Sequence, residues 1–285
     1  MCDESFFVRH ARDLTRRELG AISLGAGVAM LLPRITHALE VTSSQIDVET
    51  PDGLADCYFA HPVSGSHPGV VVWPDARGIR PAYRDIAERL AESGYSVLAV
   101  NPYYRSHRGA VLGDGADPRQ GDTMSILRPL LAELSPETER TDAITMVRFL
   151  DTQAVVDANR RMGTLGFCLG GPATFRTAAQ FPDRVGAGAS FHGVRLVTDA
   201  PTSPHLLIPR MSAEFLIAIA EDDDENDPEA KRVLRETFEK AGLRAEIEVY
   251  DGAMHSWTTP DSPVHHPAQA ERAWNRMLAL FDAAL

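Results

Sequence analysis

The stretch that decides the fold of this chain runs from Gly166 to Gly171 and reads Gly-Phe-Cys-Leu-Gly-Gly. An apolar run at 162–167 predicts a strand that leads into this stretch, and residues 172–180 predict a helix that follows it. Glycines two positions before and after the cysteine allow the strand and the helix to pack without Cβ clashes. A strand, a sharp turn and a helix in this order form a nucleophile elbow, which exposes its central side chain. We therefore predict that Cys168 is presented for chemistry at a helix N-terminus, where the helix dipole favours a thiolate.

Outward from this turn, strands alternate with helices along the chain. The run at 70–73 contains no polar residue, as in strands that are buried on both faces, and the helices show apolar residues three and four positions apart. The predicted strands span 70–73, 96–100, 162–167, 185–191, 215–220 and 245–250, and the predicted helices span 81–93, 141–151, 172–180, 228–241 and 267–284. This alternation indicates a mostly parallel sheet with helices on both faces. No repeat or linker divides residues 39–285, so we predict a single α/β domain, with a long loop at 106–120 over the site.

The composition is that of a globular protein, with 44% hydrophobic and 24% charged residues. Asp and Glu number 40 against 28 Lys and Arg, which gives a formal net charge of -12. Such a charge repels phosphate backbones and argues against a nucleic-acid partner. The three cysteines, Cys2, Cys57 and Cys168, are too few for a disulfide scaffold or a Cys-rich zinc site. We predict that the protein needs no metal or organic cofactor, and that Cys57 and Cys168 could pair in an oxidising compartment.

Residues 1–38 differ from the rest of the chain and predict an export signal. Arg16 and Arg17 precede a weakly apolar stretch at 20–32, and small residues near Ala38 suit a signal peptidase. Paired arginines before a mild apolar region are typical of signals that the twin-arginine export machinery recognises. A stable membrane anchor needs about 20 apolar residues, more than this stretch offers, and a buried N-terminal helix is the other alternative. We predict an exported, periplasmic protein, or a cytoplasmic one where the signal is not used.

A cysteine nucleophile needs a base and an acid that orients the base. In folds with a nucleophile elbow, the acid and then the histidine follow the nucleophile along the chain. Asp223 stands in the acidic run 221–224 after one predicted strand, and His255 follows the last predicted strand. Both lie beyond the carboxyl ends of strands, where α/β sheets gather their active sites. The backbone N–H of Leu169, next to the nucleophile, is a candidate oxyanion donor.

Each of these assignments has an alternative in the sequence. A free cysteine such as Cys168 is often a buried structural residue. Asp222 is the second choice for the acid, because Asp223 is favoured only by assuming a tight turn after the strand. His192 also ends a predicted strand and is a second histidine that could line the pocket. The sequence favours Cys168, His255 and Asp223 and leaves these alternatives open.

The chain resembles the dienelactone hydrolase family (carboxymethylenebutenolidases), a cysteine branch of the α/β-hydrolase fold, over about residues 45–285. The most specific parts of the resemblance are the elbow at 166–171, Ala-Glu-Asp-Asp at 220–223, and Tyr-Asp-Gly-Ala-Met-His-Ser-Trp at 250–257. The resemblance implies an α/β-hydrolase fold and places the family's acid at Asp223. It therefore supports the triad Cys168–His255–Asp223.

The resemblance also implies a carboxylate and a second oxyanion donor after the first core strand. The family has a Glu there, in a pattern like His-Glu-x-x-Gly, which holds the resting thiol neutral and helps to activate it when substrate binds. Here Asp75 takes the Glu position with a side chain one methylene shorter, and the N–H of Ala76 takes the second oxyanion position. We expect Asp75 to be the thiol-modulating carboxylate, with a simple turn residue as the alternative.

The family's substrate carries a carboxylate that two arginines bind, and one of these arginines is missing here. One falls on Arg105, whereas Thr259 occupies the position of the other, for which Arg77 or Arg108 could substitute. Because Arg–carboxylate pairs are strong, the loss of one should change the substrate preference more than the reaction type. The candidate substrate-binding residues are Arg105, Arg77, Tyr103 and Ser256.

Together these features predict a hydrolase in which Cys168 attacks an ester or lactone of a small molecule. One alternative is a carboxylesterase or thioesterase that acts on a different acyl substrate. Another is a non-catalytic binding protein of the same fold. Such a protein has no need of a nucleophile, a base and an acid together, so the sequence argues against it.

Overall fold

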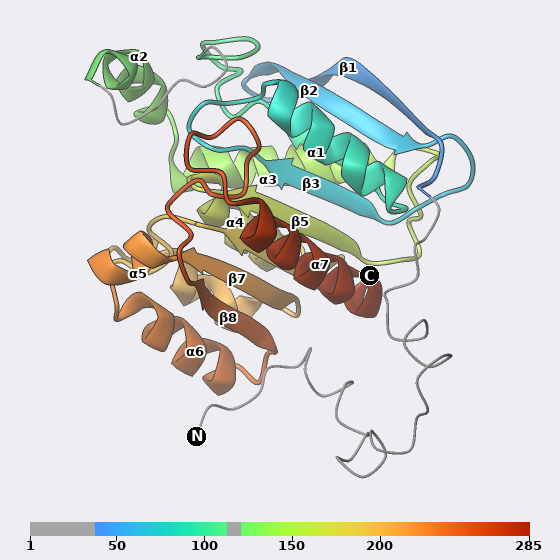
Figure 1. Cartoon of the computed structure of the whole chain (residues 1–285). Coiled ribbons are helices and arrows are strands. Elements are labelled where there is room, and N and C mark those ends of the chain that lie inside the picture. The colour runs from blue at the N-terminus through green and yellow to red at the C-terminus, as the bar shows by residue number, and fades with distance from the viewer. Residues whose placement is uncertain (1–37, 113–120) are drawn as a thin grey trace, which may run out of the picture.

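The computed structural model describes residues 38–112 and 121–285. An eight-stranded sheet in the order β1-β2-β4-β3-β5-β6-β7-β8 runs through this part of the chain (Figure 1). β1 pairs antiparallel with β2, and β2 with β4, whereas all other neighbours are parallel. The strands are β1 (Val41–Thr50), β2 (Gly53–Pro62), β3 (Gly69–Trp73), β4 (Ser96–Val100), β5 (Met162–Phe167), β6 (Val185–Phe191), β7 (Glu214–Ala220) and β8 (Ala245–Tyr250). The prediction of a mostly parallel sheet is confirmed.

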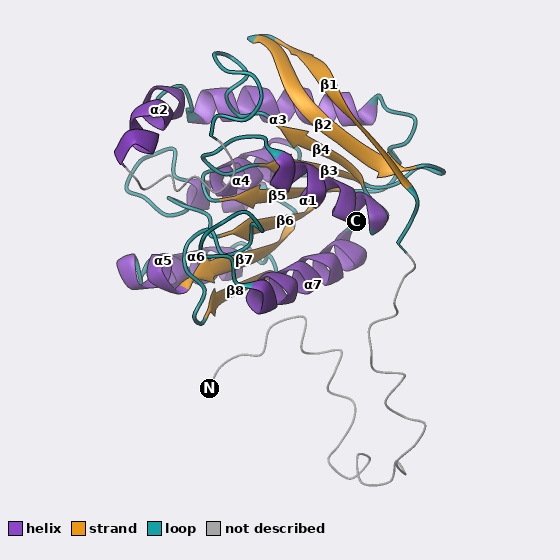
Figure 2. Cartoon of the chain, turned by 45° about the horizontal axis from the view of Figure 1, so that its top comes forward, coloured by secondary structure: helices purple, strands orange, loops and turns teal. Residues whose placement is uncertain are grey.

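Helices cover both faces of this sheet (Figure 2). α1 and α7 pack on one face, in front of the strands in Figure 1, and α3, α4 and α6 pack on the other. The helices are α1 (Pro81–Glu92), α2 (Gly121–Leu131), α3 (Pro136–Asp151), α4 (Gly170–Gln180), α5 (Glu221–Asn226), α6 (Ala230–Lys240) and α7 (Pro267–Ala284), with a 3-10 helix η3 at Pro204–Arg210. The predicted layers are therefore present.

The central strands explain why two helical layers are needed. All five residues of β3 are buried. Val71 packs into the core under α3 and α4, whereas Val70 and Val72 pack into the core under α1 and α7. Since successive side chains of a strand point to opposite faces, a continuous apolar run must be covered on both.

The sequence analysis missed the antiparallel hairpin β1–β2 at one edge of the sheet. In β1 only Val48 is buried, and polar residues fill most of the other positions. An edge strand with one solvated face needs no continuous apolar run, so the signal that identified the parallel strands is absent. α2 and η3 were also missed.

Two local predictions are wrong. α3 begins at Pro136 and not at 141, because the Ser135 hydroxyl accepts a hydrogen bond from the N–H of Thr138 and the Thr138 hydroxyl caps Ser135 in return. The acidic run after β7 forms the short helix α5 instead of a tight turn in a loop. Four acidic residues in its first turn suit the positive end of the helix dipole.

The carboxyl ends of β3, β5, β6, β7 and β8 meet at one edge of the sheet, because these neighbouring strands are parallel. This edge positions the candidate site. The predicted export signal lies outside the described residues except for Ala38, and so does most of the second half of the predicted 106–120 loop. Within the described ranges, no helix combines the length and the apolar composition that crossing a membrane requires.

Candidate active site

Cys168 occupies the turn between β5 and α4 with a left-handed backbone, φ 52°. The flanking glycines are needed for close approach: a Cβ on Gly166 would lie 2.1 Å from the carbonyl oxygen of Gly170. A Cβ on Gly170 would lie 2.2 Å from the carbonyl oxygen of Trp73. The Cys168 backbone is fixed further by its N–H, which donates to the Phe191 carbonyl at 3.0 Å. The strained turn predicted from the sequence is present, and it leaves Cys168 partly exposed.

His255, in the turn after β8, is held by two neighbouring aspartates of α5. Its ring Nδ1 lies 2.7 Å and 3.0 Å from the two carboxylate oxygens of Asp223. Its backbone N–H donates to Asp222 at 2.7 Å. Asp223 therefore contacts the imidazole and Asp222 the peptide of the same residue. The sequence left open whether Asp222 or Asp223 is the acid. In the structure only Asp223 contacts the ring of His255 and can fix its orientation.

Cys168 lies close enough to His255 to shift the pKa of its imidazole. Burial by itself would lower the pKa of His255, but the hydrogen bonds with Asp223 and Cys168 and their negative charges outweigh it and raise the pKa to about 10. Since Nδ1 faces Asp223, Nε2 is left for the sulfur. An imidazole beside a thiol is the arrangement in which the thiol and the base share one proton.

His192, directly after β6, packs against the ring of His255. Its ring stands edge-on to that of His255 with centroids 4.9 Å apart. Its Nε2 lies 2.8 Å from the hydroxyl of Thr258, and its buried Nδ1 has no partner among the described residues. Burial, followed by the charge of His255, holds the pKa of His192 well below its usual range. The ring is therefore neutral and adds no positive charge beside His255.

The two candidate oxyanion donors lie on the loops after β3 and β5. In the part of the chain that the structure describes, the N–H groups of Leu169 and Ala76 donate to no protein acceptor. Tyr103 is buried, and its hydroxyl donates to the Ala76 carbonyl at 2.9 Å. Burial, and then the charges of Asp75 and Cys168, raise the pKa of Tyr103, so its hydroxyl stays protonated. Tyr103 was predicted to bind substrate, and in the structure its hydroxyl binds the loop after β3.

Asp75 lies in a buried ion-pair network and not alone beside the thiol. Arg80, fully buried, donates to both of its carboxylate oxygens at 2.7 Å and 2.9 Å. The backbone N–H of Arg77 donates to Asp75 as well, at 2.9 Å. Both guanidinium groups also contact Asp261, Arg80 at 2.6 Å and Arg77 at 3.1 Å. Arg80 and Asp261 belong to no recognisable motif, so this network was not predictable from the sequence.

The predicted arginine ligands are each paired with acidic side chains. Arg105 binds Asp142 at 2.7 Å and Asp52 at 2.7 Å. Arg108 binds Asp47 on the exposed surface. Binding a substrate carboxylate at these arginines would mean breaking existing ion pairs.

Thr259, at the position of the missing family arginine, is fully buried, and its hydroxyl accepts a hydrogen bond from Arg77 at 3.4 Å. Of the two arginines suggested as substitutes for the family's second arginine, Arg77 is the one that contacts Thr259. Ser256, the remaining candidate, follows His255 in a left-handed conformation, φ 78°.

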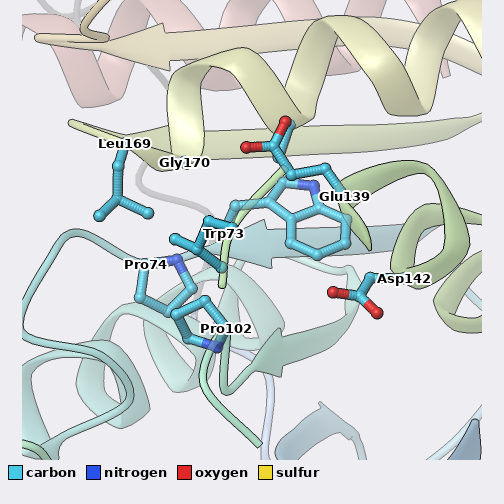
Figure 3. A pocket seen from close by; sticks show the side chains of 9 residues that line it. Trp73, Pro74, Pro102, Glu139, Asp142, Leu169 and Gly170 are labelled. Carbon is cyan, nitrogen blue, oxygen red and sulfur yellow. The ribbon is translucent and has the colours of Figure 1, made fainter. Parts of the chain in front are cut away.

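A small cavity of about 20 Å³ lies next to Leu169, with room for about one water molecule. Figure 3 shows the apolar side chains Trp73, Pro74 and Pro102 that line it, together with the carboxylates of Glu139 and Asp142 from α3. Glu139 pairs with Arg176 at 2.7 Å. The cavity adjoins Leu169, whose backbone N–H is a candidate oxyanion donor.

The second described cysteine is separate from this site. Cys57 is a buried residue of β2, and both it and Cys168 are free, so the suggested disulfide is absent. Burial, and then the charge of Asp56, raise the pKa of Cys57. Among the described residues, no group of three or more His, Cys, Asp or Glu side chains could hold a metal ion.

A comparison with protein families matches residues 55–285 to the model of the dienelactone hydrolase family. The chain belongs to this family. Its sheet and helices are those of the α/β-hydrolase fold that the family shares, as the sequence analysis expected. The protein is a hydrolase that resembles carboxymethylenebutenolidase.

Relatives and solved structures agree with the family. A Salmonella typhi protein provisionally named as a carboxymethylenebutenolidase is 30% identical over 255 residues, 82% of this chain and 90% of its own length. The Rhodococcus opacus carboxymethylenebutenolidase is 30% identical over 226 residues, 78% of this chain and 83% of its own. A crystal structure from Klebsiella pneumoniae, provisionally named as a dienelactone hydrolase, superposes with a TM-score of 0.73 at 24% identity and covers 85% of this chain and 98% of that one. The last similarity concerns the fold alone.

Proposed function

We propose that this hydrolase cleaves an ester or lactone bond of a small molecule, with Cys168 as nucleophile, His255 as base and Asp223 as the residue that orients the base. The observation that carries the proposal is the pairing of Asp223 with the His255 ring at 2.7 Å, beside Cys168 at the tip of a strained elbow. A cysteine that served only packing would need neither the left-handed turn nor the histidine.

In the first half of the reaction, the sulfur attacks the carbonyl carbon while Nε2 of His255 holds the proton that the two groups share. The oxyanion that forms accepts hydrogen bonds from the N–H groups of Leu169 and Ala76, each worth about 3 kcal/mol in comparable sites. The intermediate then releases the alcohol oxygen, which takes the proton from His255. A thioester on Cys168 remains; a lactone leaves its alcohol attached to the acyl chain.

In the second half, water attacks the thioester and gives a proton to His255. The C–S bond breaks, the acid is released, and the sulfur regains its shared proton with His255. Asp223 holds the imidazole so that the same Nε2 serves both halves. Every step uses side chains and backbone N–H groups of this chain with water as co-substrate.

The test is the initial rate of hydrolysis of dienelactone and of p-nitrophenyl acetate by purified protein. We expect Cys168→Ala to abolish both rates, whereas the matched variant Cys57→Ala, at a buried cysteine outside the site, should keep them. A dead Cys168→Ala with p-nitrophenyl acetate as the better substrate keeps the nucleophile and assigns the enzyme to simple esters. Rates that do not depend on Cys168, or a folded protein inert toward both, would contradict the proposal, and the latter would favour a binding protein.

We propose further that residues 1–38 export the protein to the periplasm through the twin-arginine machinery. Replacing both Arg16 and Arg17 by Lys should retain the protein in the cytoplasm, because this machinery recognises the pair. Cell fractionation measures the outcome, with Arg34→Lys as the matched control. Periplasmic protein from the double variant would count against this route.

A further inference from the structure

We propose that Arg195 is a specificity-determining residue of this site and binds an anionic group of the substrate, a carboxylate above all. The inference rests on the proposed function, since it assumes an ester or lactone at Cys168. Arg195 is an exposed residue of the loop after β6. No sequence motif marks it.

The first observation is the backbone conformation of Arg195. In the described part of the chain, four residues other than glycine have a left-handed φ: Cys168 at 52°, His192 at 42°, Arg195 at 55° and Ser256 at 78°. Three of them belong to the site: the elbow, the ring behind His255, and the residue after His255. Strained residues of this kind cluster at functional sites, where the surrounding structure maintains them. The left-handed backbone of Arg195 is therefore a property that it shares with these three site residues.

The second observation is the attachment of its loop to the elbow. The N–H of Val194 donates to the carbonyl oxygen of Cys168 at 3.1 Å. Gly193 packs against the first turn of α4 so closely that a Cβ on Gly171 would lie 2.7 Å from its Cα. The backbone that carries Arg195 is thus fixed on the turn that presents the nucleophile.

The third observation concerns the reach of the guanidinium. Glu139 lines the cavity beside Leu169. Burial raises the pKa of Glu139 to about 7, and the positive charges of Arg176 and Arg195 both oppose this rise. The positive charge of Arg195 therefore acts on a carboxylate that lines the cavity.

The fourth observation is that Arg195 is uncompensated. Arg77, Arg80, Arg105 and Arg108 all pair with aspartates. Arg195 has no ion pair and no side-chain hydrogen bond within the described ranges. It can therefore take a ligand carboxylate, in the two-pronged geometry that guanidinium groups favour, without first breaking a contact.

The experiment compares the carboxylate form of dienelactone with its neutral methyl ester. The variants are Arg195→Asn, which removes the charge and tolerates the left-handed backbone, and Arg195→Lys, which keeps the charge. Arg232→Gln, at an exposed arginine of α6, is the control for the loss of one positive charge. Both kcat/KM and the dissociation constant are measured, the latter with the carboxylate lactone in the Cys168→Ala protein, which does not consume it.

We expect Arg195→Asn to lower kcat/KM for the carboxylate lactone roughly tenfold or more, as loss of a charged hydrogen bond predicts, through a higher KM. The rate with the methyl ester should stay unchanged, Arg195→Lys should restore part of the loss, and about 0.5 M salt should weaken the effect. Equal losses on both lactones, or none on the carboxylate, would overturn the inference.

The two proposals fail in different ways. If no substrate turns over in a Cys168-dependent manner, the proposed function fails, while the dissociation constants still decide on Arg195. If turnover depends on Cys168 but Arg195→Asn changes neither kcat/KM nor the dissociation constant of the carboxylate, the function stands and Arg195 is not a ligand.

Discussion

Asp75 after β3 and Asp223 after β7 occupy equivalent places at the carboxyl edge of the sheet, yet their partners differ. Asp223 keeps 28% of its side chain exposed and binds the Nδ1 of His255. Asp75 keeps 5% and binds the guanidinium of Arg80 through both carboxylate oxygens. The first partner is a group that can gain and lose a proton, whereas the second is always charged.

This difference shows that the partner, and not the position at a strand end, decides what a carboxylate does. An aspartate on imidazole sets the orientation and the proton affinity of a base. An aspartate paired with a buried guanidinium compensates a positive charge whose burial would otherwise be costly. Asp75 therefore holds the loop after β3 in place. We therefore expect Asp223 to act on the rate and Asp75 to act on the stability. The role of Asp75 as a thiol-modulating carboxylate stays a prediction.

The largest effect is expected for Asp223→Asn. The amide offers the imidazole a donor in place of an acceptor and disturbs the tautomer, so kcat should fall about 10³-fold. Asp222→Asn is the matched variant, because Asp222 contacts only the peptide of His255, and it should cost about tenfold or less. Steady-state kinetics on p-nitrophenyl acetate measures both. A larger loss for Asp222→Asn would make Asp222 the orienting acid.

The next effect is expected on stability from Asp75→Asn. Removing the charge leaves Arg80 buried with Asp261 as its only carboxylate, and the free energy of unfolding should fall by about 3 kcal/mol. Urea unfolding followed by circular dichroism measures it. Glu229→Gln, in an exposed pair of α6, serves as the control and should change little. An unaltered urea midpoint for Asp75→Asn, with a large loss of rate, would instead favour the thiol-modulating role.

A smaller effect is expected for Arg80→Lys. Lysine keeps the positive charge but cannot donate to both oxygens of Asp75 and to Asp261 together, so stability should fall by about 1–2 kcal/mol. The same urea titration measures it. A loss of stability equal to that of Asp75→Asn would mean that the two-pronged hydrogen bonding of the guanidinium, and not its charge, holds the loop after β3.

The smallest effect is expected in the pH dependence. The pKa of His255 is raised to about 10 from the ordinary 6.5, so its contribution to stability is complete below 6.5 and is lost as the pH rises through 10. Removing the sulfur in Cys168→Ala takes away two of the causes and should lower this pKa. Proton NMR of the imidazole follows the titration in both proteins. The Asp75–Arg80 pair should show no loss over the same range, because arginine stays charged.

Much of the fold was predictable because strong local signals coincide with it. The apolar run of β3 and the mostly apolar runs of β5 and β6 are buried throughout, as predicted for strands covered on both faces. The β1–β2 hairpin was not predictable in this way, because its outer strand is half solvated and its pattern is weak. The start of α3 depends on a reciprocal cap between Ser135 and Thr138, which an apolar pattern does not reveal.

The sequence by itself determined the elbow, because close packing at Gly166 and Gly170 excludes any side chain and leaves a readable spacing. It also determined which strand ends carry an acid and a histidine. Only the tertiary structure decided which partner each charged group meets: Asp223 with His255, Asp75 with Arg80, and Arg105 with Asp142. The physical reason is that ion pairs join residues far apart in the chain and depend on distances of a few ångströms. Sequence spacing does not encode such distances, whereas steric exclusion at a turn is local and does leave its mark on the sequence.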